Sequence, residues 1–170
     1  LGTIPALAHL AEGIGDPQDR NRGTIGGSVA NNDPAADYPA ACLALNATIK
    51  TNQREIKAED FFTGMFETAL EEGELITSVN FPRPDKAAYM KFPNPASRYA
   101  IVGVFVAKFG ADVRVAVTGA GDNGVFRAAE LESALAGSFS PSALENTTIS
   151  PDDLLSDIHA IAHALKAVLK

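Results

Sequence analysis

The segment RNRGTIGGSVANNDPAAD, residues 20–37, concentrates small hydrogen-bonding side chains around two adjacent glycines. Gly26 and Gly27 lack a Cβ atom, so the backbone there can turn in ways closed to other residues and can lie against a ligand. Successive backbone N–H groups in such a turn can converge on one anion, such as a phosphate. The residues alone favour a simpler explanation, a tight turn leading into a helix, because paired glycines are common in turns.

The polar side chains of the same segment extend the ligand hypothesis. Thr24 and Ser28 carry hydroxyls, and Asn32 carries an amide. The carboxylate of Asp37 is unsuited to a phosphate, but it can accept hydrogen bonds from ribose hydroxyls or a ring N–H. This mixture predicts a nucleotide-like ligand that has both phosphate groups and polar ring or sugar edges. The alternative is that Asp33 and Asp37 are ordinary helix caps.

The elements that must position this segment are short. A cap at Thr3, Pro5 in the first turn and apolar residues at helical spacing predict a first helix that ends at Gly13 and Gly15. Apolar patterns and turn residues predict the other elements. Further helices are expected at 37–45 and, capped by Asp60, at 61–66; strands are expected at 47–51, 54–57 and 75–81.

The pattern changes between residues 82 and 86. Strands are predicted at 88–92, 101–109 and 113–118, and helices at 128–136 and 157–169. The last two strands are joined by a hairpin-length loop, so an antiparallel sheet is expected. The predicted fold class is α+β, in which a mixed α/β part at 1–84 is followed by a domain at 85–170 with a three-stranded antiparallel sheet packed with helices.

Composition narrows the possible partners. A net charge of −7 argues against nucleic acid as the main partner. Cys42 is the only cysteine, so an internal disulfide and a thiolate-bound iron–sulfur cluster are excluded, and its apolar neighbours indicate a core residue. No apolar run is long enough to span a membrane, and no secretion signal opens the sequence. A cytoplasmic protein is expected.

Two other patterns look functional at first. Gly119, Gly121 and Gly124 fit G-x-G-x-x-G, but this dinucleotide fingerprint requires a parallel βαβ unit and a helix that opens at the third glycine. The preceding strands are predicted to form a hairpin, so a loop is expected instead. His159 and His163 are four residues apart on a predicted helix. They lack a third ligand, and no metal site is predicted.

Three strings carry a resemblance to a known family. GIGDPQDRNRGTIGGSVANNDPAADYPAACLAL resembles the flavin-binding subunits of the molybdenum hydroxylases, which include the medium subunit of carbon monoxide dehydrogenase and the flavin domain of xanthine dehydrogenase. DFFTGMFETALEEGELITSVNFP is similar to the next block of that family, and YMKFPNPASRYAIVGVFVAKF is similar to the start of its C-terminal domain. The resemblance runs in order along nearly the whole chain.

The resemblance implies FAD as the cofactor and assigns residues to it. In the family, the Thr-Ile-Gly-Gly-Ser turn lies against the pyrophosphate and flavin, an aspartate is a ligand, a strand residue borders the isoalloxazine and a lysine follows on the next strand. The matching cofactor-binding residues here are Thr24, Ile25, Gly26, Gly27, Ser28, Asn32 in the polar segment that follows, Asp37, Ile76 and Lys91. No side chain is implied as a catalytic acid or base.

The resemblance also implies partners and a role. Family members carry electrons from two iron–sulfur clusters through FAD to a quinone, NAD or another acceptor. The implied partners are a molybdopterin-containing large subunit and a 2Fe-2S small subunit. Two other hypotheses stay open: a non-enzymatic interaction module that has lost flavin, and an unrelated binding protein for another nucleotide.

Two departures from the family pattern affect these expectations. Asp19 stands where an aliphatic residue is usual, and its charge would be costly if it were buried. The family also has an earlier glycine-rich loop, in a subdomain that precedes the residues matched here, and the sequence opens at Leu1. The chain is therefore expected to be the second flavin subdomain plus the C-terminal domain, and to be empty of FAD in isolation.

Overall fold

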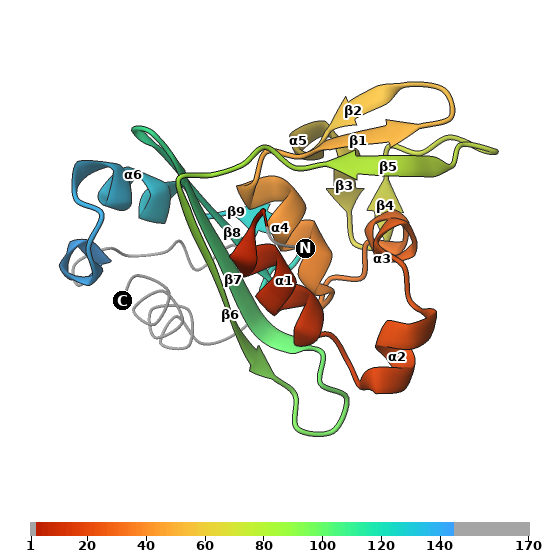
Figure 1. Cartoon of the computed structure of the whole chain (residues 1–170), viewed down its shortest axis with the longest axis horizontal. Coiled ribbons are helices and arrows are strands. Elements are labelled where there is room, and N and C mark those ends of the chain that lie inside the picture. The colour runs from red at the N-terminus through yellow and green to blue at the C-terminus, as the bar shows by residue number, and fades with distance from the viewer. Residues whose placement is uncertain (1–2, 145–170) are drawn as a thin grey trace.

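Helices dominate the first part of the chain in the computed structural model, which describes residues 3–144 (Figure 1). They are α1 (Pro5–Glu12), α2 (Pro17–Arg22), α3 (Ile25–Asn31) and α4 (Asp37–Ala44). The predicted helices near 3–13 and 37–45 are thus confirmed. The predicted cap at Thr3 is wrong, because the N-cap residue of α1 is Ile4, which makes no side-chain cap. Pro5, whose fixed φ suits a first helical position, opens the helix instead.

Helix α2 was not predicted, because its sequence PQDRNR has no apolar face. The start of α2 nevertheless has a local signal in the sequence. The Asp16 carboxylate accepts the N–H groups of Gln18 at 2.7 Å and Asp19 at 2.9 Å, while the Asp19 carboxylate accepts the Asp16 N–H at 3.3 Å. This reciprocal pair is a capping box. It also explains Asp19: the side chain is exposed, so no buried charge results.

Helix α4 is buried along most of its length, which identifies it as a central element of the core. Cys42 is fully buried within it, as expected for a core residue. Burial raises the pKa of the Cys42 thiol well above its ordinary value. The thiol therefore stays protonated and is a poor nucleophile.

Two small sheets follow α4. The first has strand order β2-β1-β5, with β1 (Thr48–Thr51), β2 (Glu55–Lys57) and β5 (Ile76–Asn80) all antiparallel, which confirms the predicted hairpin and strand. The second pairs β3 (Phe62–Gly64) with β4 (Glu67–Thr68). The helix predicted at 61–66 is wrong. Helix α5 (Ala58–Phe61) ends where that prediction begins, because Phe62 is extended and Phe66 has a φ of 57°.

Glu74 ties the loop before β5 to the β1–β2 turn. Its carboxylate accepts hydrogen bonds from Arg54 Nε at 3.0 Å, from Thr51 Oγ1 at 2.7 Å and from the Glu71 N–H at 2.9 Å. The hydrogen bond from Arg54, followed by those from Glu71 and Thr51, lowers the pKa of Glu74 from 4.5 to about 2. Because the folded state lowers this pKa, Glu74 stabilises the fold above about pH 4.5, and that stabilisation is lost as the pH falls through about 2.

We therefore expect Glu74→Gln to lower the free energy of unfolding most at neutral pH. The difference from the unsubstituted protein should shrink as the pH is lowered toward 2, since the protonated carboxyl loses the same interactions. Urea unfolding across this pH range measures both. Glu72→Gln, at an exposed neighbouring position, is the matched control. A Glu74→Gln deficit that does not change with pH would contradict the assignment.

The second part of the chain is built on a larger antiparallel sheet of order β6-β7-β8-β9. Its strands are β6 (Lys86–Pro93), β7 (Ala100–Phe109), β8 (Asp112–Thr118) and β9 (Phe126–Arg127). Helix α6 (Ala129–Gly137) and a 3-10 turn (Pro141–Leu144) follow. The prediction of three strands was short by one, because β9 has two residues and carries no periodic signal. The helix predicted at 157–169, with its two histidines, lies outside the described residues.

Helices cover both faces of this sheet (Figure 1). Helices α1 and α4 pack on one face, where Tyr89, Phe105 and Ala116 join the same buried cluster as Leu10 and Cys42. Helix α6 packs on the other face over the valines of β7 and β8. Residues before and after position 84 therefore share one hydrophobic cluster.

A buried arginine adds a polar connection across the same position. Arg114 of β8 donates from Nε to the Leu43 carbonyl of α4 at 3.2 Å, and its Nη2 donates to Glu59 of α5. Glu59 also accepts from Arg127 of β9. The helices of the first part are thus held to the large sheet by packing and by charge-assisted hydrogen bonds.

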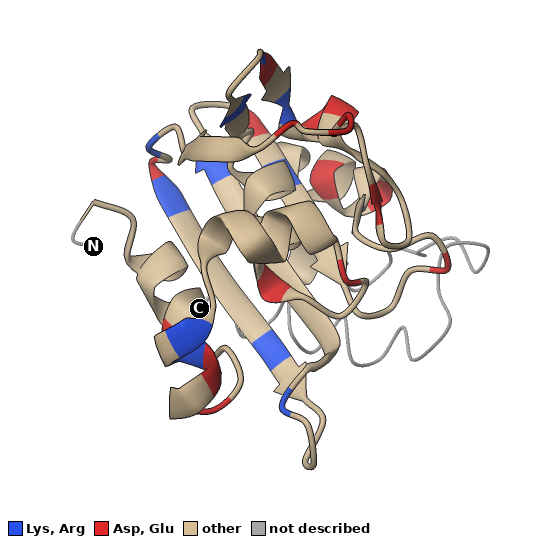
Figure 2. Cartoon of the chain, turned by 90° about the vertical axis from the view of Figure 1, so that its right-hand side faces the viewer, with Lys and Arg blue, Asp and Glu red and all other residues tan. Residues whose placement is uncertain are grey.

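Ribbon segments of Lys or Arg and of Asp or Glu are both spread over several elements in the view of Figure 2. None of the helices in the described part of the chain is both long enough and apolar enough to cross a membrane.

Candidate cofactor-binding site

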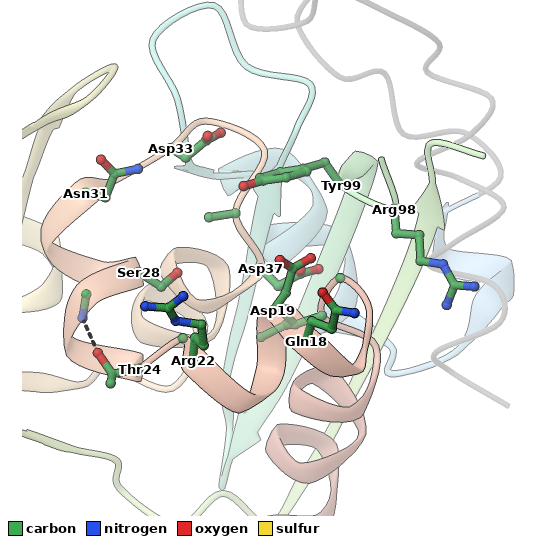
Figure 3. A pocket seen from close by; sticks show the side chains of 15 residues that line it. Gln18, Asp19, Arg22, Thr24, Ser28, Asn31, Asp33, Asp37, Arg98 and Tyr99 are labelled. Carbon is green, nitrogen blue, oxygen red and sulfur yellow. Dashed lines mark hydrogen bonds between the residues drawn. The ribbon is translucent and has the colours of Figure 1, made fainter. Parts of the chain in front are cut away.

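A cavity of about 640 Å³ opens between α2, α3, the loop that leads into α4, and the turn before β7 (Figure 3). It is lined by small polar groups and by charges of both signs. The polar lining residues are Gln18, Asp19, Arg22, Thr24, Ser28, Asn31, Asp33, Asp37, Arg98 and Tyr99. The segment 20–37 therefore forms much of one wall of the cavity.

The glycine pair does not form the turn that was predicted. Thr24 is the N-cap of α3, and its Oγ1 accepts the Gly27 N–H at 3.0 Å, so Gly26 and Gly27 lie in the first helical turn (Figure 3). Neither glycine has the positive φ that a left-handed turn requires. The threonine cap explains the difference, because it closes the first turn of a helix over residues that could also have turned sharply.

The two glycines have different surroundings. A Cβ on Gly26 would lie 3.9 Å from Ile76, the first residue of β5, in ordinary van der Waals contact. A Cβ on Gly27 would meet Thr24 Oγ1 at 3.0 Å, and Gly27 lines the cavity. The cavity wall therefore carries no side chain at the position of Gly27. Gly26 and Ile76 lie together behind that wall.

Ile25 lines a smaller cavity of about 240 Å³ beside the first one. Thr24 and Ser28 line both cavities, and half-buried Tyr38 contributes to the smaller one. The two cavities thus adjoin at the start of helix α3.

Asn32 does not line either cavity. It is the C-cap residue of α3, in the left-handed region with a φ of 44°. Its buried amide nitrogen donates to the carbonyls of Gly64 at 2.8 Å and Glu67 at 2.9 Å. These bonds fasten the end of α3 to the β3–β4 hairpin. In the described structure, the side chain of Asn32 holds the fold around the site together.

The loop that carries Asp37 is clamped by the end of β8. Thr118 Oγ1 donates to the carbonyls of Pro34 at 2.9 Å and Ala36 at 2.7 Å, and the Gly119 N–H donates to Pro34 at 2.8 Å. Two donor groups therefore hold this loop: the Thr118 hydroxyl, whose one proton is shared between two carbonyls, and the Gly119 N–H. The cavity wall is fixed to the large sheet immediately before Asp37.

The G-x-G-x-x-G pattern belongs to this clamp. Gly119 has a φ of 86°, and a Cβ there would lie 2.6 Å from the Ile101 carbonyl oxygen, so no other residue fits without strain. Gly121 and Gly124 continue a loop between the antiparallel strands β8 and β9, and no helix opens at Gly124. The rejection of a dinucleotide fingerprint is confirmed.

Asp37 is the buried acid of the cavity, and it is held by two residues of β6. Tyr89 donates its hydroxyl to Oδ1, and Lys91 Nζ donates to Oδ2 at 3.1 Å. Lys91 Nζ also donates to the Gly13 carbonyl at the end of α1, at 2.7 Å. The side chains of Asp37 and Lys91 are 6% and 8% exposed. Lys91 does not line the cavity, so of this pair only the carboxylate is presented there.

Burial raises the pKa of Asp37 above its ordinary 3.8, against the lowering effects of Tyr89 and Lys91. A carboxyl with a raised folded pKa stabilises the folded state only below its unfolded pKa, and that stabilisation is lost as the pH rises through the folded pKa. At neutral pH, ionised Asp37 therefore lowers the free energy of unfolding. A carboxylate kept buried at the wall of a cavity is typical of a functional site.

Sequence reasoning missed part of the lining. Arg98 and Tyr99 come from the turn before β7, far along the chain from α3. Arg98 has a φ of 61°, an uncommon conformation for a residue other than glycine. No local pattern links this turn to α3.

Residues 3–144 contain no cluster of three His, Cys, Asp or Glu that could hold a metal ion.

Comparisons with known proteins show the family of the chain. Residues 2–84 match the family model described as the FAD binding domain in molybdopterin dehydrogenase. The glyceraldehyde dehydrogenase medium chain of Sulfolobus acidocaldarius is 41% identical over 140 residues, which cover 76% of this chain and 50% of that relative. The nicotine 6-hydroxylase medium subunit of Paenarthrobacter nicotinovorans is 36% identical over 173 residues, 94% of this chain and 61% of the relative.

A solved structure supports the same class. The reconstituted CO dehydrogenase from Oligotropha carboxidovorans contains a chain that superposes with a TM-score of 0.80 at 26% identity, over 98% of this chain and 66% of that one. The matched domain is the FAD-binding domain of the molybdopterin dehydrogenases. The chain belongs to the FAD-binding medium subunits of the molybdenum hydroxylases. It spans about half the length of the first relative.

The cofactor of this family is FAD, and the residues of the cavity fit it in kind. Hydroxyls, backbone N–H groups and exposed Arg22 suit phosphate, and the buried carboxylate of Asp37 suits a ring N–H or ribose hydroxyls. Gly27 leaves a stretch of wall free of side chains, as a bulky ligand requires. The cavity also has the volume typical of cofactor sites.

Proposed function

We propose that this protein is the FAD-binding electron-transfer component of a molybdenum-containing hydroxylase or dehydrogenase. It receives electrons from the iron–sulfur clusters of a partner subunit and passes them through FAD to an external acceptor. Its partners are a molybdopterin-containing large subunit and a 2Fe-2S small subunit. Membership of the medium-subunit family supports this role, and related chains have names that place them in dehydrogenases.

The observation that carries the proposal is the cavity, whose wall combines the bare backbone of Gly27 with the buried carboxylate of Asp37. FAD, when bound, supplies the redox chemistry. The protein holds and orients the cofactor: Thr24, Ser28 and Arg22 bind its phosphates, and Asp37 accepts from a polar edge. Ile76 contributes to the apolar layer behind α3. Lys91 acts behind Asp37 by keeping it ionised.

The lone cysteine is consistent with iron–sulfur clusters and FAD that are bound by different subunits. Cys42 is fully buried, and a thiolate-ligated cluster needs several cysteines. This supports the proposal that the clusters that feed the flavin are bound by a partner chain.

The test is the visible absorption of the complete protein, purified aerobically with its co-purifying partners. We expect bound flavin close to one per chain, which is bleached by reductant and recovers when an acceptor such as a quinone or NAD is added. A complete protein that is folded and carries no flavin would instead be an interaction module. Flavin that stays reduced in the presence of every acceptor would contradict the electron-transfer role.

A further inference from the structure

We propose that Tyr89 is a positioning residue of the flavin site, whose hydroxyl orients the Asp37 carboxylate toward the cavity. The inference rests on the proposed function, because it concerns how the FAD-binding acid is held. Tyr89 does not line the cavity and acts only through Asp37.

The geometry begins with strand β6. Tyr89 and Lys91 are two residues apart, so their side chains leave the same face of the strand. They reach the two oxygens of Asp37 from that face, Tyr89 at Oδ1 and Lys91 at Oδ2. With one donor on each oxygen, the carboxylate cannot rotate without breaking a hydrogen bond. Its remaining lone pairs are available to a ligand.

The sheet reserves space for the Tyr89 hydroxyl. Gly103 of β7 pairs with Lys91, and a Cβ on Gly103 would collide with the Tyr89 hydroxyl oxygen and lie 2.9 Å from Thr118 Cγ2. Glycine inside a buried strand weakens the strand, and it often marks a close approach by another group. Here the approaching group is the phenol. This is a second observation, independent of the hydrogen bond, that the fold is built around this hydroxyl.

The phenol is suited to be a permanent donor. Tyr89 is 5% exposed, and its ring packs against Phe105 with the centroids 5.9 Å apart. Burial, then the charge of Asp37, raises the pKa of Tyr89 far above its ordinary value. The hydroxyl therefore stays protonated at every physiological pH and donates to Asp37 whenever Asp37 is ionised.

The same geometry makes a pH-dependent prediction. Tyr89 and Lys91 from β6 and Tyr38 from α4 lie against Asp37, while Asp19, Arg22, Asp33 and Arg98 share its cavity. Of these, Tyr89 and Lys91 supply the side-chain hydrogen bonds that lower the pKa of Asp37. Losing the Tyr89 hydroxyl should therefore raise the pKa of Asp37, and FAD affinity should begin to fall at a higher pH on acidification.

The experiment measures the dissociation constant of FAD against pH in the complete protein and its Tyr89→Phe variant. Phenylalanine keeps the ring packing. We expect roughly tenfold weaker binding at neutral pH and an acid midpoint about one pH unit higher, the size expected for one hydrogen bond to a charged group. Gly103→Ala displaces the hydroxyl while keeping tyrosine, so it should shift the midpoint in the same direction.

Tyr38→Phe is the matched control, because the described residues offer its hydroxyl no hydrogen-bond partner and it is next to Asp37 in the sequence. Its pH midpoint should not move. Tyr89→Phe with unchanged affinity, or with weaker affinity and an unmoved midpoint, would overturn the positioning role. Unsubstituted protein that binds no FAD at any pH would instead overturn the proposed function itself, so the two failures are distinct.

Discussion

Substituting Gly27 with valine should raise the dissociation constant of FAD about 100-fold or more, equivalent to roughly 3 kcal/mol of binding free energy. Gly27 lies in the first turn of α3 and forms cavity wall without a side chain. Valine would place branched methyl groups in that space and restrict their rotation. The backbone itself tolerates the change, because Gly27 is helical and has no positive φ. Fluorescence titration with FAD measures the effect.

The control for this substitution is Gly137→Val. Gly137 is also helical, at the end of α6, and a Cβ there meets no atom within 4 Å. Valine should leave FAD affinity unchanged at that position. Urea unfolding of the FAD-free proteins checks that Gly27→Val stays folded, because its Cβ approaches the Thr24 cap at 3.0 Å. Retention of FAD by folded Gly27→Val at the unsubstituted level would show that the cofactor does not press on α3.

Replacing Lys91 with methionine should lower the free energy of unfolding by about 3–5 kcal/mol at neutral pH. Methionine has a similar shape, but it leaves the buried carboxylate of Asp37 without its cation and the Gly13 carbonyl without its donor. The loss of the cation raises the folded pKa of Asp37 further above 3.8. The penalty is therefore largest at neutral pH and diminishes as the pH falls toward 3.8, because Asp37 becomes protonated in the folded state with or without Lys91.

Urea unfolding at neutral pH and near pH 4 separates this effect from lost packing. The double variant Asp37→Asn, Lys91→Met removes both charges and should recover much of the stability at neutral pH. Lys86→Met, at an exposed position on the same strand, should change stability by less than about 0.5 kcal/mol. A Lys91→Met deficit that is equal at both pH values, or undiminished in the double variant, would contradict the buried ion pair.

The fold was predictable where local patterns are strong. Apolar spacing located α1, Asp37 and Pro39 marked the start of α4, and the apolar strands β7 and β8 were predicted with their hairpin, for which Gly110 supplies a φ of 59°. Polar α2 and the two-residue β9 have no such pattern. The predicted helix at 61–66 failed because extended Phe62 is set by pairing with Thr68, which a local apolar run does not reveal.

The candidate site was predictable only in its continuous part. The segment that contains Thr24, Gly27 and Asp37 stands out by composition, although its helical conformation does not. Arg98 and Tyr89 reach the site through pairing of β6 with β7 and packing of α4 on the sheet, which are long-range effects. Local sequence could also not tell that Asn32 turns its amide nitrogen toward the β3–β4 hairpin.

The cluster shared across position 84 bears on how such a chain can be divided. The family model ends at residue 84, which makes that position an obvious place to shorten the chain. In the N-terminal piece, Leu10 and Cys42 would lose the strands that bury them. In the C-terminal piece, Arg114 would lose its hydrogen bond to the Leu43 carbonyl. Neither piece would keep a closed interior, so a shortened version for expression should extend through β8.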